Sequence, residues 1–71
     1  MDVRRRVGHN LKRFRQELGL SQENFAFKAG LHRTYISGIE RGVRNPTILV
    51  LDQLADALGV QPAKLLETVD S

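Results

Sequence analysis

Residues 21–44 read SQENFAFKAGLHRTYISGIERGVR, and this stretch decides the fold. Two short helical patterns flank a glycine turn at Gly30. In the second pattern, Ile36 and Ile39 share one side of a helix with a 3.6-residue period. The opposite side carries a row of hydrogen-bonding side chains. A protein core has no use for such a row, whereas it matches the edges of base pairs in a DNA major groove.

Helix-start and helix-stop signals divide the whole chain into five predicted helices and no strand. Asp2, Ser21 and Thr47 suit the position before a helix, and glycines follow the first four helices. Pro62 suits the first turn of a short last helix that holds Leu65 and Leu66. The other four predicted helices cover about residues 3–18, 21–29, 33–41 and 47–58. We therefore expect an all-α fold in a single domain over residues 1–71, with its core at about 3–67.

Apolar stripes on two helices define the predicted core. The stripe residues are Val3, Val7, Leu11, Phe14 and Leu18 in the first helix, and Ile48, Leu51, Leu54, Ala55 and Leu58 in the fourth. With 71 residues and no cysteine, the chain has to fold by packing or by dimerising, without disulfides. The lack of cysteine fits a reducing cytoplasm. No apolar run reaches membrane-spanning length, and the N-terminus lacks the apolar segment of a signal peptide.

The two parts of the chain differ in charge. Residues 1–45 hold ten Lys or Arg against four Asp or Glu, a balance of +6. Residues 46–71 hold one against four, a balance of −3. Either the basic part faces a polyanion while the rest stays away from it, or the bias belongs to an ordinary solvated surface.

Several motifs together resemble those of the lambda-repressor-like (Cro/C1, or XRE) helix-turn-helix family. The matching segments are Leu-Gly-Leu-Ser-Gln at 18–22, Ala-Gly at 29–30, Thr-Tyr-Ile-Ser at 34–37, Ile-Glu-Arg-Gly at 39–42 and Leu-Ala-Asp-Ala-Leu-Gly-Val at 54–60. The resemblance spans roughly residues 7–67, and the segment 33–41 looks most like the controller proteins of restriction-modification systems. It implies a dimeric, operator-binding bacterial or phage regulator of the cytoplasm, which blocks or recruits RNA polymerase.

Five residues are predicted to contact bases: Arg33, Thr34, Tyr35, Ser37 and Arg44. The guanidinium fork of Arg33 matches guanine O6 and N7, although it also suits a single phosphate. Thr34 either bonds a base or lies in solvent. Tyr35 lies nearer the buried side, so it either presses on the DNA sugars or packs against the preceding helix. Ser37 is predicted to contact base or phosphate, and Arg44 to reach past the backbone to a base.

Four residues are predicted to contact the DNA backbone: Gln22, His32, Arg41 and Asn45. Gln22 begins a helix, where free N–H groups and the helix dipole favour phosphate, and the resemblance assigns it to the operator. His32 precedes the reading helix. Since histidine is a poor N-cap, either this turn is weaker or the ring contacts DNA.

Arg15, Glu40 and Gly38 have predicted roles other than a direct contact with DNA bases or phosphates. Arg15 and Glu40 border the core sides of their helices, and the resemblance supports a partly buried ion pair between them. Two independent surface charges are the alternative. Gly38 lies mid-helix on the predicted outward side, where it costs about 1 kcal/mol relative to alanine. Either close approach to the groove floor explains it, or the helix tolerates an imperfection.

Leu49 and Val50 lie off the predicted core stripe of the fourth helix. The resemblance places a two-fold contact near the fourth and fifth helices, so we predict a homodimer interface there. A stray exposed leucine is the alternative.

Other functions have weaker support in the sequence. The same fold could serve as an interaction module for a protein partner, such as an antitoxin or adaptor, but the polar row argues against that as the sole role. Two isolated histidines, His9 and His32, make no metal site, and no catalytic motif is present. We expect no enzyme activity, no cofactor, no small-molecule ligand and no membrane partner.

Overall fold

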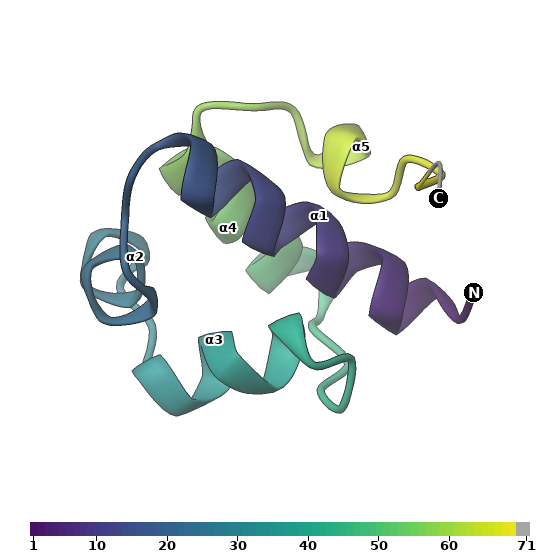
Figure 1. The fold of residues 1–71 in the computed structure, drawn as a ribbon, viewed down its shortest axis with the longest axis horizontal. Helices are drawn as coiled ribbons and strands as arrows, with labels where there is room; N and C mark the ends of the chain where they lie inside the picture. The colour runs from purple at the N-terminus through teal and green to yellow at the C-terminus, as the bar shows by residue number, and fades with distance from the viewer. Residues whose placement is uncertain (70–71) are drawn as a thin grey trace.

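The computed structural model describes residues 1–69, and these residues form five helices and no strand, as predicted (Figure 1). The two last residues of the predicted domain, 70 and 71, lie outside the described residues. The helices, in chain order, are α1 Val3–Glu17, α2 Gln22–Ala29, α3 Arg33–Glu40, α4 Ile48–Leu58 and α5 Pro62–Leu65. None of the helices within residues 1–69 combines the length and hydropathy needed to traverse a lipid bilayer.

The predicted helix signals act where expected. The hydroxyl of Ser21 accepts the N–H of Asn24 at 3.0 Å, and that of Thr47 accepts the N–H of Val50 at 3.1 Å. Each bond satisfies one N–H that the first helical turn leaves without a partner. Gly30 ends α2 in the left-handed conformation, with φ of 72°, which glycine adopts without the clash that a Cβ causes. This turn changes the direction of the chain between α2, seen nearly end-on in Figure 1, and α3, which runs across the view.

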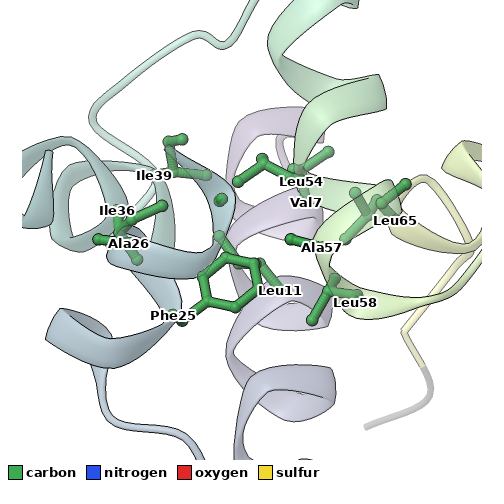
Figure 2. Packing of buried hydrophobic residues seen from close by; sticks show 12 residues of the cluster. Val7, Leu11, Phe25, Ala26, Ile36, Ile39, Leu54, Ala57, Leu58 and Leu65 are labelled. Atoms are coloured by element: carbon green, nitrogen blue, oxygen red, sulfur yellow. The ribbon is translucent and has the colours of Figure 1, made fainter. Parts of the chain in front are cut away.

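The core lies where all five helices meet (Figure 2). Leu11 of α1, Phe25 of α2, Ile36 and Ile39 of α3, Leu54 of α4 and Leu65 of α5 are fully buried there. Burying such side chains is the main favourable contribution to folding in a chain without disulfides. The core therefore fixes α3 from its inner side, through residues spaced by three.

The predicted stripes are wrong at their ends. Val3 and Leu18 lie at the two ends of α1, and each is 47% exposed. Ile48 begins α4 and is 84% exposed, whereas Val50, which we expected off the core, packs against it. At 3.6 residues per turn, Val50 shares the side of Leu54, and Ile48 is turned away from it.

Two close contacts of α1 were missed in the sequence. Asn10 is 1% exposed, and its amide nitrogen donates to the carbonyl oxygens of Leu65 and Glu67 at 3.0 and 2.9 Å. It thereby anchors the chain around the end of α5. Gly8 lies against the last turn of α3, where a Cβ would overlap the carbonyl oxygens of Ile39 and Glu40. The absence of a side chain at Gly8 lets α1 and α3 approach closely.

Candidate nucleic-acid interface

An ion pair connects the inner side of α3 to α1, and a hydrogen bond connects it to α2. Arg15 Nε and Nη2 donate to Glu40 Oε2 and Oε1 at 2.6 and 3.0 Å. The two side chains are only 9% and 3% exposed. Arg15 Nη1 also donates to the carbonyl oxygen of Leu20 at 2.7 Å, and Gln22 Nε2 donates to Glu40 Oε1 at 3.0 Å. Such a two-pronged, charge-assisted contact fixes orientation as well as distance, so it holds α3 rigidly.

Gln22 is thereby placed differently from the expectation. Its amide nitrogen, which we expected to face DNA, donates inward to Glu40. The side chain stays partly exposed at the start of α2. A phosphate contact by Gln22 would therefore use the second N–H of its amide or the backbone N–H groups of the helix end, because a phosphate oxygen accepts hydrogen bonds.

The outer side of α3 is open. Arg33, Thr34 and Arg41 are exposed, and Ser37 is partly exposed between them. Ile36 and Ile39 occupy the opposite side and are fully buried. The predicted row of hydrogen-bonding side chains is therefore on the surface, and residues 1–69 leave Arg33, Thr34 and Arg41 exposed.

His32 caps α3, although histidine is a poor N-cap. Its Nδ1 accepts the backbone N–H of Thr34 at 3.1 Å and lies 2.7 Å from the Thr34 hydroxyl. The imidazole thus replaces the usual hydroxyl or carboxylate cap. Because Nδ1 is used within the protein, only the rest of the ring and the other face of Thr34 remain for a ligand.

Arg44 and Tyr35 come together over Gly38. A Cβ on Gly38 would lie 2.5 Å from Arg44 Cγ, so the arginine side chain covers this position. The Arg44 guanidinium carbon lies 5.8 Å from the centre of the Tyr35 ring. Gly38 is buried, so the predicted outward, open placement of this residue is wrong. Asn45 follows as an exposed residue.

A second group of basic side chains lies beside α3, and the sequence did not predict that they gather there. A surface hollow of about 250 Å³ between α1 and the end of α3 is lined by Arg5, His9, Lys12, Glu40 and Arg41, with Met1 at its edge. The sequence signals for it were the +6 balance of residues 1–45 and the basic run Arg4, Arg5 and Arg6, which could form an arm that touches DNA or lie in solvent. It extends the basic surface from Arg41 onto α1.

Comparisons with known proteins agree with this arrangement. The helix-turn-helix family profile matches residues 11–65. The chain is 46% identical over 70 residues to the uncharacterised HTH-type transcriptional regulator y4dJ of Sinorhizobium fredii, which covers 99% of this chain and 91% of that protein.

Two solved structures superimpose closely on this fold. The restriction-modification controller protein C.AhdI from Aeromonas hydrophila gives a TM-score of 0.84 at 42% identity, covering 87% of this chain and 94% of that one. SinR, a master regulator for biofilm formation solved in complex with DNA, gives a TM-score of 0.82 at 37% identity, covering 86% and 98%. The fold and the resemblance to controller proteins are thus confirmed.

Proposed function

This chain belongs to the helix-turn-helix family of transcription regulators, and from that premise we propose that it binds a palindromic duplex DNA operator as a homodimer. The observation that carries the proposal is the two-sided construction of α3. Its inner side is locked by the buried Arg15–Glu40 pair, and its outer side offers uncovered donors. A short rigid helix with one polar side fits into a major groove.

Each predicted contact residue keeps a role in this proposal. Arg33, Thr34, Tyr35, Ser37 and Arg44 would meet bases, with Tyr35 acting through the shape of the DNA because it is half-buried. The residues that would hold the phosphate backbone are Gln22, His32, Arg41 and Asn45. The regulator would act by occupying its operator, so that RNA polymerase is blocked or recruited according to where the operator lies.

The homodimer is supported by an apolar surface at the start of α4. Ile48 and Leu49 are 84% and 82% exposed, which is unusual for neighbouring large apolar residues. Beside Ile48 lies a hollow of about 210 Å³, lined in part by Val7, Leu51 and Leu66. A projecting apolar side chain next to an apolar hollow suits a two-fold contact, in which each copy offers both. Half-site centres would then lie about 34–36 Å apart.

Replacing Leu49 tests the dimer. Leu49→Glu should give monomers in sedimentation at micromolar concentration, because burying a charge in an apolar contact is costly. Phe27→Glu is the matched control, since Phe27 is 90% exposed on α2 and lies outside the proposed interface. If Phe27→Glu dissociates the protein and Leu49→Glu does not, the contact lies on α2 instead.

Selection from a random duplex pool tests the function directly. We expect enrichment of a two-fold symmetric site with half-sites one helical turn apart. Binding to the selected site should weaken steeply with salt, since each neutralised phosphate releases counterions. If no sequence is enriched and mixed duplex DNA binds without a salt slope, the fold serves a protein partner instead.

A further inference from the structure

Gly38 lies in the last turn of α3 and is buried, although the sequence placed it on the outward side. The atoms nearest to a Cβ built on it are Arg44 Cγ at 2.5 Å, Nε at 3.4 Å and Cδ at 3.5 Å. All three belong to one side chain, that of Arg44, which follows α3 in the loop. Arg44 therefore occupies the place that a side chain at position 38 would take.

Three further contacts hold Arg44 in this place. The backbone N–H groups of Val43 and Arg44 both donate to the carbonyl oxygen of Gly38, at 3.0 and 3.2 Å. These bonds fold the chain back against α3. The guanidinium then lies 5.8 Å from the Tyr35 ring centre, within the range of a cation–π contact. Since Tyr35 precedes Gly38 by three residues, Arg44 runs along one turn of α3.

The Arg44 guanidinium keeps its charge available. The ion pairs among residues 1–69 are Arg4–Asp2, Arg15–Glu40 and Lys64–Glu67, and none of them uses Arg44. Arg44 is also exposed. An arginine fork fixed in position beside a reading helix can donate to guanine O6 and N7 without first losing side-chain freedom.

We propose that Gly38 is a specificity-determining position that acts through Arg44. Having no side chain, Gly38 admits the Arg44 side chain onto the reading side of α3, so that an arginine from the loop meets a base there. Gly38 is thus a positioning residue, and Arg44 is the residue that it positions. This inference rests on the proposed DNA-binding function.

Gly38→Ala separates this role from folding. The three atoms nearest to the added methyl group all belong to the Arg44 side chain, so Arg44 has to leave this place while the inner side of α3 is not touched. Alanine also favours the helix over glycine, so the melting temperature should rise by about a few degrees. We expect affinity for the selected operator to fall about tenfold, with the preference lost at one base pair. A merely structural glycine would show neither the rise in stability nor the local loss of preference.

The Arg44→Ala background supplies the matched control. Arg44→Ala alone should lose the preference at the same base pair as Gly38→Ala. Adding Gly38→Ala to it should raise the melting temperature again but change DNA binding no further, because the displaced side chain is already gone.

Three results would overturn the inference. One is a Gly38→Ala variant that keeps the selected sequence and affinity of the unchanged protein. A second is uniform weakening over all single-base variants, which would make Arg44 a phosphate contact. A third is a double variant, Gly38→Ala with Arg44→Ala, in which the two losses of DNA affinity add up. If the unchanged protein selects no sequence at all, the proposed function fails first, and this inference falls with it.

Discussion

The two sides of α3 differ in how their charged groups are placed: those on the inner side are buried and paired, and those on the outer side are exposed. On the inner side, Glu40 is 3% exposed in its side chain, and all its contacts are within the protein, with Arg15 and Gln22. On the outer side, Arg33 and Arg41 are exposed and take part in none of the ion pairs among residues 1–69. A helix of eight residues has little stability alone, so its rigidity comes from the inner side. The open side can then keep its donors for a ligand.

Among the substitutions that test this difference between the two sides, Glu40→Ala should cause the largest loss of stability. Glu40→Ala leaves Arg15 buried without its partner and removes the acceptor of Gln22. Removing one member of a buried pair costs about 3–5 kcal/mol, because the remaining charge stays out of water. Urea unfolding would measure the loss.

The exposed pair of Lys64 with Glu67 provides the control. These side chains are 55% and 49% exposed, so Glu67→Ala should cost about 0–1 kcal/mol. Equal losses for the two variants would show that the Arg15–Glu40 pair does not hold α3.

A second test places a methyl group against the inner side of α3, by Gly8→Ala in α1, and on its outer side, by Gly38→Ala in α3 itself. Gly8 faces the backbone carbonyls of Ile39 and Glu40, whereas Gly38 faces a flexible side chain. Gly8→Ala should lose about 1–3 kcal/mol, since overpacking against a fixed backbone forces the two helices apart. Thermal unfolding of both variants would show opposite shifts. A more stable Gly8→Ala variant would mean that the contact between α1 and α3 is looser than it appears in the structure.

Arg33 tests the outer side alone. Arg33→Ala should change the free energy of unfolding by less than about 0.5 kcal/mol, because Arg33 is exposed and takes part in none of the ion pairs among residues 1–69. Its binding to the selected operator should weaken by about 1–3 kcal/mol, with relaxed choice at one base pair. Titrations against single-base operator variants would measure this. Uniform weakening would instead assign Arg33 to a phosphate.

Local signals predicted the framework of the fold. Cap residues and glycines gave the helix bounds to within a residue or two, and the three-residue spacing of Ile36 and Ile39 gave the buried side of α3. The Arg15–Glu40 pair could be predicted because both residues border apolar stripes, and the family resemblance supported it.

What remained hidden depends on directions that no helical period encodes. Arg44 covers Gly38 because the loop turns back onto α3, and a helical wheel contains no loop. Ile48 and Val50 exchanged their predicted places because the apolar residues of α4 cover a wide part of its surface, and the period alone does not say which part faces the other helices. Asn10 was missed because its two acceptors lie more than 50 residues away along the chain.

The smallest expected effect concerns the exposed ion pair at the start of α1. The Asp2 carboxylate accepts from the Arg4 side chain at 3.2 Å and from the Arg4 N–H at 2.7 Å. These bonds, the side-chain one first, hold the pKa of Asp2 below its ordinary value of 3.8. Because the folded pKa is the lower one, the contribution to stability is present above pH 3.8 and disappears as the pH falls through the folded pKa.

Asp2→Asn isolates this contribution. Asparagine keeps an acceptor for the N-cap but does not titrate, so the melting temperature of the variant should fall slightly less than that of the unchanged protein between pH 7 and pH 2. Both carboxylates of the comparison, Asp2 and Glu40, are paired with arginine, but only Asp2 is in water. A change at Asp2 as large as the one at Glu40 would mean that burial does not distinguish the two pairs, and the rigidity of α3 would need another source.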